Sequence, residues 1–198
     1  MAGMIAQVCM RWMALSVLAV SLIAAPAAAA DGSPAAWTAL VNDNPVALIR
    51  HGNAPPGEGG DPPGFKIDDC ATQRNLDDKG RAQAKALGEA FRRQGVPVGK
   101  ILSSPWCRCL ETARLMALGP VDNTLAVAAS ERSPERLAAL KQIVAGWRGP
   151  GTLVVVTHAL TVRALVGFMP EQAETVVIRP KLGHEPAIEV VGRIRPPD

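Results

Sequence analysis

Apolar residues after position 44 gather in short continuous runs that are separated by longer segments of mixed polarity. The clearest run is residues 152–156, Thr-Leu-Val-Val-Val, which follows a Gly-Pro-Gly turn. Residues 46–49, Val-Ala-Leu-Ile, form a similar run that ends at Arg50. Uninterrupted apolar runs of this length, bounded by turn residues, predict strands that are buried on both faces. Weaker β patterns cover residues 100–103, 125–129, 174–179 and 187–194.

Between these runs, apolar residues recur at spacings of three and four, which is the period of a helix with one buried face. The strongest example is residues 78–94, where Ala84, Leu87 and Phe91 share a face and Asp77 is a suitable N-cap. Serine-proline pairs have the chemistry of a cap followed by a first helical turn. Such pairs predict a helix from 104–105 to about 118 and another from 133–134, and a last helix is expected over 160–168.

Strands that alternate with helices predict one α/β domain, a three-layer sandwich whose mostly parallel central sheet has helices on both faces. In such sheets ligands bind beyond the carboxyl ends of the strands. His51 follows the first predicted strand and His158 follows the strand at 152–156, so both are expected at this edge. Residues 54–68 hold four prolines and four glycines, which predicts a long loop of the kind that often carries function.

The first thirty residues follow a different pattern. A basic residue precedes an apolar run over residues 12–25, and small residues ending at Ala30 come next. This order is that of a secretory signal peptide cleaved after Ala30. A retained membrane anchor is the alternative, although the run is shorter than the roughly 20 residues that a membrane-spanning helix needs. We therefore expect a signal peptide over 1–30, a single domain over 31–198, a periplasmic or secreted protein, and no stable membrane insertion after cleavage.

Composition narrows the class of protein. Of the 198 residues, 48% are apolar and 20% are charged, which is typical of a globular domain rather than a disordered chain. The formal net charge of +3 is mild and the basic residues are scattered. A nucleic-acid partner is therefore not expected.

Three cysteines follow the predicted signal peptide: Cys70, Cys107 and Cys109. In an oxidising compartment two of them can form a disulfide and leave one thiol over. We favour a bond between Cys70 and Cys107, and three buried thiols are the alternative.

Four side chains near the predicted sheet edge have the chemistry of a phosphate site: Arg50, His51, Arg108 and His158. Guanidinium groups are permanently charged forks that suit the oxygens of a phosphate monoester dianion. A neutral His51 imidazole can attack phosphorus and form a phosphohistidine that water hydrolyses. His158, with an unperturbed pKa of about 6.5, is expected to stay partly protonated and to stabilise charge on the transferring group. Because these groups supply positive charge, neither a metal nor another cofactor is required.

Four segments resemble the motifs of one family, in the order in which that family has them. Residues 48–53, LIRHGN, resemble the RHG signature of the histidine phosphatase (phosphoglycerate mutase-like) superfamily. Residues 76–84, LDDKGRAQA, resemble its L-(S/T)-x-x-G-x-x-Q-A helix start. Residues 103–114, SSPWCRCLETAR, and 154–159, VVVTHA, resemble its S-S-P-x-x-R-x-x-E-T-A element and its strand-ending histidine motif. A lone RHG is a weak signal, whereas four ordered motifs with fitting spacing are specific.

The resemblance implies the phosphoglycerate mutase-like fold and a phosphomonoester hydrolase in which His51 is the nucleophile. Arg50, Arg108 and His158 would complete the phosphate pocket, and the side-chain amide of Asn53 would contribute to substrate binding. Two other classes stay open: a catalytically inactive phosphate-binding protein of the same fold, and a metal-dependent hydrolase. No closely spaced pair of ligands supports a zinc site made by the three histidines of the chain.

The leaving oxygen of the substrate needs an acid. Phosphoglycerate mutase-like relatives have a glutamate after the third strand, and Glu131, in Ser-Glu-Arg, has a similar placement. The resemblance therefore implies Glu131 as the proton donor, and the alternative is a solvated glutamate before a helix cap. Glu58, Asp61 and Asp69 of the long loop are competing donors.

Two positions depart from the acid phosphatase branch of the same superfamily. That branch extends the first motif to R-H-G-x-R-x-P and has an acidic residue after the second histidine, whereas this chain has Ala54 and Ala159 there. The compact chain with its export signal resembles small exported bacterial members, including those similar to lipopolysaccharide core heptose phosphatases. We expect a small phosphorylated substrate such as a sugar or envelope phosphate, selected by residues 54–68 and by the segment after Leu118.

Overall fold

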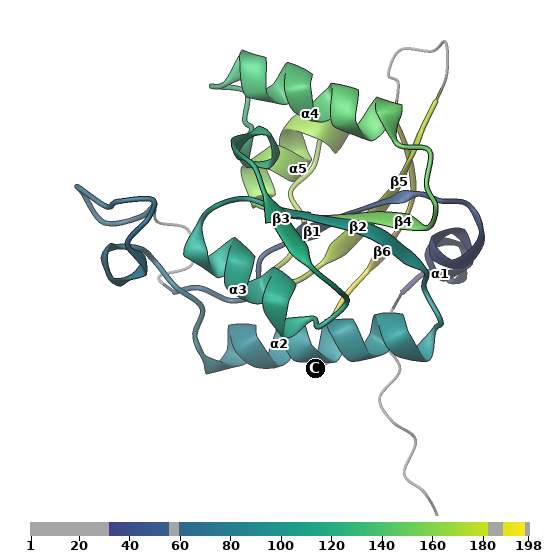
Figure 1. Cartoon of the computed structure of the whole chain (residues 1–198), viewed down its shortest axis with the longest axis horizontal. Helices are drawn as coiled ribbons and strands as arrows, with labels where there is room; N and C mark the ends of the chain where they lie inside the picture. The colour runs from purple at the N-terminus through teal and green to yellow at the C-terminus, as the bar shows by residue number, and fades with distance from the viewer. Residues whose placement is uncertain (1–31, 56–59, 182–187, 197–198) are drawn as a thin grey trace, which may run out of the picture.

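A six-stranded sheet with the order β3-β2-β4-β1-β5-β6 forms the middle of the molecule (Figure 1). The computed structural model describes residues 32–55, 60–181 and 188–196, so the predicted signal peptide, Glu58 and His184 lie outside the described residues. Strands β1 to β4 pair in parallel, and β5 and β6 pair antiparallel at one edge. The strands are β1 (Val46–Arg50), β2 (Val98–Ser103), β3 (Val121–Asn123), β4 (Thr152–Thr157), β5 (Thr175–Pro180) and β6 (Ile188–Ile194).

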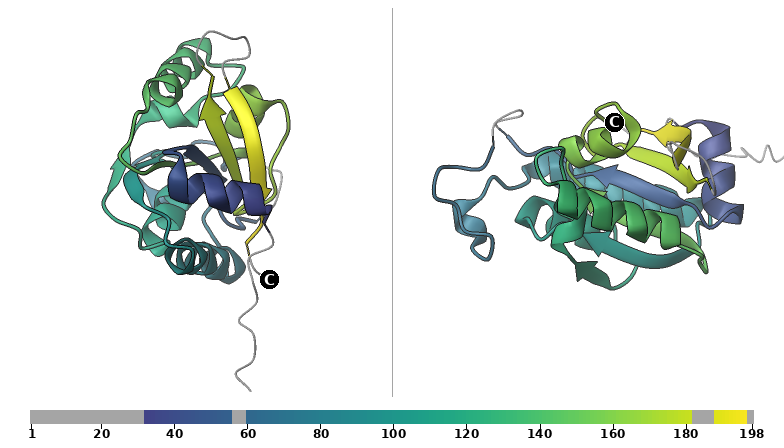
Figure 2. Two further views of the ribbon diagram at one scale, coloured as in Figure 1. Left: turned by 90° about the vertical axis from the view of Figure 1, so that its right-hand side faces the viewer. Right: turned by 90° about the horizontal axis from the view of Figure 1, so that it is seen from above.

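Helices cover both faces of this sheet, with α4 and α5 on one side and α2 and α3 on the other (Figures 1 and 2). The helices are α1 (Pro34–Asn42), α2 (Asp78–Arg93), α3 (Cys107–Leu115), α4 (Pro134–Gly146) and α5 (Ala159–Val166), with short 3-10 helices η1 (Cys70–Thr72) and η2 (Leu125–Ala128). No helix among the described residues is long and apolar enough to cross a bilayer. The predicted three-layer α/β sandwich with a mostly parallel sheet is therefore confirmed.

Successive residues of β1 pack into two separate hydrophobic cores, one on each face of the sheet. Ala47 and Ile49 belong to the core that contains Phe91 of α2, whereas Leu48 belongs to the core that contains Leu140 of α4. Because side chains alternate between the faces of a strand, a strand covered on both faces is apolar at every position. This double burial is the physical reason for the uninterrupted apolar runs in β1 and β4.

The start of α2 lies tightly against the loop that follows β1. The Asp77 carboxylate accepts a hydrogen bond from the Gly80 N–H at 2.8 Å, which makes Asp77 the N-cap that the sequence predicts. A Cβ atom on Gly52 would lie 2.5 Å from the Gly80 carbonyl oxygen, and one on Gly80 would lie 2.2 Å from the Asn53 carbonyl oxygen. Both positions therefore need glycine because the two backbones touch.

The third strand is not where the sequence predicts it. The apolar run at 125–129 forms the 3-10 helix η2, and the strand that pairs with β2 is Val121–Asn123. The hydroxyl of Thr124 accepts from the Ala126 N–H and caps η2, which turns the chain away from the sheet edge. Val127 is then fully buried in the core beneath α4 rather than paired in the sheet.

Helix α3 begins at Cys107, two residues later than the Ser-Pro pair at 104–105 predicts. Trp106 occupies the N-cap position without a side-chain cap bond. The hydroxyl of Ser104 lies 2.8 Å from Nε2 of His158. The serine is thus engaged at the sheet edge, and this tertiary contact replaces the predicted cap.

Candidate active site

The ends of β1 and β4 bring two histidines side by side. Arg50 pairs with Thr157 across the two strands, and His51 and His158 each follow by one position. His51 is 3% exposed, and its backbone N–H donates to the Thr157 carbonyl oxygen at 3.0 Å. The two imidazole rings have centroids 5.6 Å apart and planes inclined by 70°. Both rings therefore lie at the carboxyl edge of the parallel strands, where the sequence predicts them.

The hydrogen bond that His51 makes with its own neighbour selects one tautomer. Nδ1 of His51 lies 2.8 Å from the Gly52 carbonyl oxygen, and because a carbonyl only accepts, Nδ1 carries the hydrogen and Nε2 holds the lone pair. Burial is the largest influence and lowers the pKa of His51 to about 3. Three arginines add to this lowering, against the opposing hydrogen bond to Gly52. At neutral pH the ring is a neutral base with its lone pair on Nε2.

His158 is held on two sides by polar groups. Its Nδ1 lies 3.5 Å from a terminal nitrogen of Arg108, which only donates, so Nε2 carries the hydrogen and donates to the Ser104 hydroxyl. Burial first, and then the positive charge of Arg108, lower the pKa of His158 well below its usual value. This differs from the partly protonated imidazole expected from the sequence. The difference arises because the ring is largely withdrawn from water and lies beside fixed positive charges.

Three guanidinium groups surround the histidine pair. Arg108 of α3 is 6% exposed and contacts His158 directly. Arg50 is anchored by a 2.9 Å hydrogen bond from Nη1 to the carbonyl oxygen of Pro170. Arg74, which the sequence analysis did not single out, lowers the pKa of both histidines, as Arg50 and Arg108 do. The cluster is therefore a concentration of positive charge around two neutral imidazoles, which suits a multiply charged anion.

A buried carboxylate lies next to this positive cluster. Oδ1 of Asp61 lies 2.7 Å from Nη1 of Arg108, and the Asp61 side chain is 6% exposed. Oδ1 also accepts from the Arg74 backbone N–H at 3.0 Å, and Oδ2 accepts from Nε1 of Trp106 at 2.9 Å. Burial acts to raise the pKa of Asp61, but the hydrogen bonds from Arg108, Arg74 and Trp106 outweigh it and lower the pKa below the usual value.

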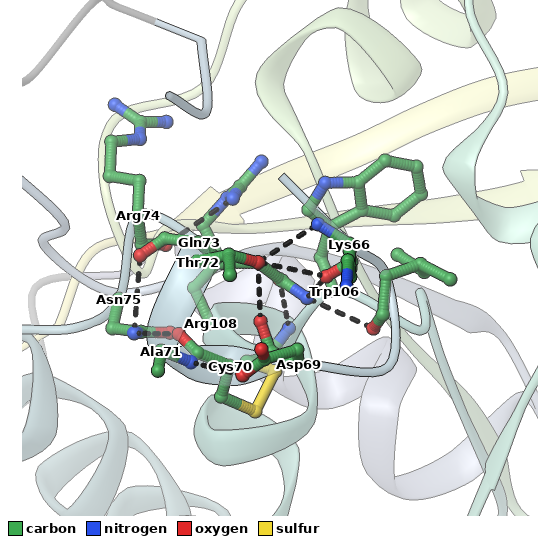
Figure 3. Close-up of a disulfide and its surroundings, with 12 residues drawn as sticks. Lys66, Asp69, Cys70, Ala71, Thr72, Gln73, Arg74, Asn75, Trp106 and Arg108 are labelled. Atoms are coloured by element: carbon green, nitrogen blue, oxygen red, sulfur yellow. Dashed lines mark hydrogen bonds between the residues drawn. A yellow bond between two sulfur atoms is a disulfide. The ribbon is translucent and has the colours of Figure 1, made fainter. Parts of the chain in front are cut away.

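A disulfide fastens the segment that carries Asp61 and Arg74 to α3. Cys70 and Cys107 are bonded, as the sequence analysis favours, with Cα atoms 5.7 Å apart. Figure 3 shows Gln73 beside this bond, and its Oε1 accepts from the Cys107 N–H at 3.0 Å. Nε2 of Gln73 donates to the carbonyl oxygens of residues 66 and 67. The long loop is therefore held against the first turn of the helix that presents Arg108.

The third cysteine, Cys109, packs against the ring of His158. The Sγ atom of Cys109 is 3.7 Å from Nε2 of His158 and 3.6 Å from the Thr157 carbonyl oxygen. Complete burial raises the pKa of the Cys109 thiol to about 12. It stays a neutral thiol that packs against the imidazole, and it does not have the chemistry of a nucleophile.

Asn53 links the loop after β1 to the start of α2. Its side-chain Nδ2 donates to Oδ2 of Asp77 at 2.6 Å, and its backbone N–H donates to Oε1 of Gln83 at 2.9 Å. These contacts direct Asn53 to the N-terminus of α2. The contribution of this amide to substrate binding stays a prediction.

Glu131, the proton donor implied by the sequence resemblance, lies at the surface. Its side chain is 63% exposed, and Oε2 lies 3.4 Å from Nη2 of Arg163 on α5. The described contacts of Glu131 do not join it to the histidines or to Arg108. The carboxylate that the structure brings to the cluster is that of Asp61, one of the competing donors.

Arg74 and Trp106 are not predicted from the sequence, because neither residue carries a signal of its own. Trp106 lies inside the S-S-P-x-x-R element at a position where any residue is allowed. Its ring is inclined by 85° to that of His158, with centroids 5.3 Å apart. The available signal for Arg74 is its place two residues before the helix-start motif at 76–84. The contact between the backbones of Gly52 and Gly80 holds the start of α2 against the loop after β1. Arg74 lies just before this helix and therefore comes to the sheet edge that carries His51.

Chemically, the cluster can bind a phosphoryl group and attack it with a nitrogen. The guanidinium charges around the two imidazoles favour an oxyanion over a cation. Among the described residues no group of three or more His, Cys, Asp or Glu side chains is arranged to hold a metal ion.

Comparison with known proteins finds one matching family model and several similar solved structures. Residues 46–132 match the family model of the histidine phosphatase superfamily (branch 1).

The structure of the protein histidine phosphatase SixA complexed with tungstate is similar at 17% identity and a TM-score of 0.55, covering 77% of this chain and 97% of that chain. Phosphoglycerate mutase from Thermus thermophilus is similar at 18% identity and a TM-score of 0.50, covering 76% and 98%. A phosphoserine phosphatase mutant from Entamoeba histolytica in complex with phosphoserine is similar at 16% identity and a TM-score of 0.53, covering 75% and 95%. No curated protein sequence matches significantly. The chain thus shares the phosphoglycerate mutase-like fold.

Proposed function

We propose that the protein is a phosphomonoester hydrolase of the histidine phosphatase superfamily that acts through a phosphohistidine on His51. One observation carries this proposal. The Nδ1–H of His51 is bound to Gly52 and its Nε2 lone pair is available, in a ring that stays neutral beside three guanidinium groups. A nucleophilic nitrogen that faces concentrated positive charge is suited to a phosphorus atom that carries anionic oxygens.

The arginines bind the substrate in the first step. The oxygens of a phosphate monoester dianion accept hydrogen bonds from Arg50, Arg74 and Arg108, whose charges do not titrate in the physiological range. The added negative charge reverses the electrostatic environment of His158, and its pKa rises. A protonated His158 then stabilises the charge that spreads over the oxygens of the transferring group. The guanidinium groups supply the positive charge for this step, and the proposal therefore involves no metal.

Two displacements at phosphorus complete the reaction. In the first, a bond forms between Nε2 of His51 and phosphorus, the bond from phosphorus to the leaving oxygen breaks, and that oxygen takes a proton from an acid. In the second, a water oxygen attacks phosphorus, the nitrogen–phosphorus bond breaks, and inorganic phosphate leaves. His51 returns to its neutral form, and the acid regains its proton from the attacking water.

We further propose that the protein is an exported member of a small bacterial branch of this superfamily and acts outside the cytoplasm. The signal-peptide pattern of residues 1–30 supports this. The disulfide between Cys70 and Cys107 also supports it, because such bonds persist in oxidising compartments. The substrate is then a small phosphorylated compound such as a sugar or envelope phosphate. The phosphoserine bound to one structural neighbour belongs to the same chemical class.

The proposal is tested by phosphate release from a panel of sugar phosphates, phosphoserine, nucleotides and p-nitrophenyl phosphate. His51→Ala should abolish turnover, and Arg108→Ala should lower kcat/KM by at least about 100-fold because a buried charge-assisted contact is lost. Arg136→Ala, which removes an exposed arginine from α4, is the matched control and should retain full activity.

Direct trapping distinguishes a phosphatase from an inactive phosphate-binding protein. Rapid acid-free quenching with a ³²P-labelled substrate should leave acid-labile label on the wild type and none on His51→Ala. Phosphate release that is equal in the two proteins would contradict the histidine mechanism. Binding of phosphate esters with no turnover across the panel would favour the binding protein, and activity that requires added zinc would favour a metal-dependent hydrolase.

A further inference from the structure

Asp61 and His158 share one guanidinium group. Nη1 of Arg108 contacts the Asp61 carboxylate at 2.7 Å, and Nη2 of Arg108 contacts Nδ1 of His158 at 3.5 Å. The two terminal nitrogens of a planar fork are fixed relative to each other. A phosphoryl group bound beside His158 and Arg108 would therefore be separated from the Asp61 carboxyl group only by the guanidinium group of Arg108.

The Asp61 carboxylate is also held in a defined place. The indole N–H of Trp106 and the backbone N–H of Arg74 fix its two oxygens from other directions. Trp106 directly precedes Cys107, and Arg74 follows Cys70 by four positions, so both donors flank the disulfide. A group that is oriented by three donors and 6% exposed loses little freedom when it acts on a bound substrate.

We infer that Asp61 is the proton donor to the leaving oxygen and the proton acceptor for the attacking water, a role that rests on the proposed phosphatase function. The assignment replaces Glu131, whose carboxylate contacts Arg163 at the surface. Among the described residues, Asp61 supplies the carboxylate that contacts Arg108, and Arg108 also contacts His158.

The proton reaches Asp61 with the substrate. A phosphate monoester has a second pKa of about 6, so near neutral pH part of it arrives as a monoanion that still carries a proton. This proton passes to Asp61 when the phosphoryl oxygens take over the positive charge of Arg108, since a carboxylate beside a dianion binds a proton more strongly. The carboxyl group then gives the proton to the leaving oxygen as the bond to phosphorus breaks. The resulting carboxylate takes a proton from the water that attacks the phosphohistidine, and this proton leaves with inorganic phosphate as its monoanion, so that Asp61 ends the cycle ionised.

Leaving-group dependence separates a proton donor from a residue that merely orients Arg108. p-Nitrophenolate leaves without help, whereas the alkoxide of glycerol phosphate needs a proton. In Asp61→Asn, kcat/KM for glycerol phosphate should fall by about 100- to 10,000-fold, the usual contribution of general acid catalysis. The first turnover of p-nitrophenyl phosphate, seen as the burst of p-nitrophenolate, should slow by less than about tenfold, because its leaving group is acidic.

Matched variants complete the experiment. Asp68→Asn removes an exposed carboxylate from the same loop and should keep the wild-type ratio of the two substrates. Asp61→Glu keeps a carboxyl group and should also keep that ratio near the wild-type value, even if both rates drop. This variant serves as the second test if Asn at position 61 disturbs folding, which thermal unfolding and titration with inorganic phosphate would reveal.

Several results would overturn the assignment of Asp61. One is an equal loss on both substrates, which would make Asp61 a positioning residue for Arg108. Another is a selective loss on glycerol phosphate in Glu131→Gln instead of Asp61→Asn. Either result leaves the proposed function intact as long as turnover in the wild type depends on His51. Absence of His51-dependent turnover in the wild type would instead remove the proposed function and the inference with it.

Discussion

A Cβ atom on Gly80 would lie 2.2 Å from the carbonyl oxygen of Asn53, so the first turn of α2 touches the backbone that follows His51. Gly80→Ala should therefore push these segments apart. We expect a loss of about 1–3 kcal/mol in the free energy of unfolding, as for other overpacked sites, together with a lower kcat/KM because His51 moves. Urea denaturation measures the first effect. Gly146→Ala is the control, since a Cβ there meets no atom within 4 Å, and an equal loss in both variants would contradict the role of the contact.

The depressed pKa of His51 predicts a dependence of stability on pH. Folding lowers this pKa from 6.5 to about 3. Between pH 3 and pH 6.5, His51 is therefore protonated in the unfolded chain and neutral in the folded protein. The associated stability is fully present above about pH 6.5 and is lost as pH falls toward 3. On going from pH 7 to pH 4, wild type should lose about 3 kcal/mol more than His51→Gln. Identical losses in urea denaturation at the two pH values would show that the ring is not buried as a neutral base.

The disulfide predicts sensitivity to reduction. The bond joins cysteines 37 positions apart, so its loss should lower the free energy of unfolding by about 2–4 kcal/mol. The Cys70→Ser, Cys107→Ser double variant should match reduced wild type in thermal unfolding, and dithiothreitol should have no further effect on it. Phosphate should also bind more weakly to the double variant, because the disulfide joins the segment that carries Arg74 to the helix that carries Arg108. Unchanged phosphate affinity would mean that the disulfide stabilises the fold without organising the anion site.

Arg74 predicts a third contribution to anion binding that the sequence motifs do not reveal. Removing a guanidinium group that takes part in charge-assisted hydrogen bonding costs about 1.5–3 kcal/mol. Arg74→Ala should therefore raise the Kd for inorganic phosphate by about 10- to 150-fold in isothermal titration. Arg136→Ala is again the control. An unchanged Kd in Arg74→Ala would place this guanidinium outside the anion site.

The parts of the fold that the sequence predicts well are those that local patterns determine. Double burial forces every position of β1 and β4 to be apolar, and the cap of α2 depends on Asp77 and the N–H three residues later. The sequence predicts a strand at 125–129 because its apolar residues look alike in either state. Its actual shape depends on the Thr124 cap and on a contact between the Thr157 hydroxyl and the Val127 carbonyl oxygen, which joins segments 30 positions apart.

The same distinction applies to the candidate site. His51, His158, Arg50 and Arg108 stand at strand ends or at a helix start, so topology alone gathers them. Asp61 lies in a loop whose conformation is set by a disulfide and by long-range hydrogen bonds, and its partner Arg108 is 47 positions away. Glu131 has a suitable place in the sequence order, but its side chain pairs with an arginine of α5. Sequence order could not reveal which of the two carboxylates turns inward.

The covalent bond between η1 and the first turn of α3 also bears on how such a protein can diversify. It fixes one end of the long loop at the catalytic edge, independently of the residues that lie between β1 and η1. Insertions or replacements in the stretch before Asp61 can then change which side chains meet the substrate while the anion-binding groups keep their positions. New substrates can therefore be acquired by changing a short segment, with the reaction chemistry inherited unchanged.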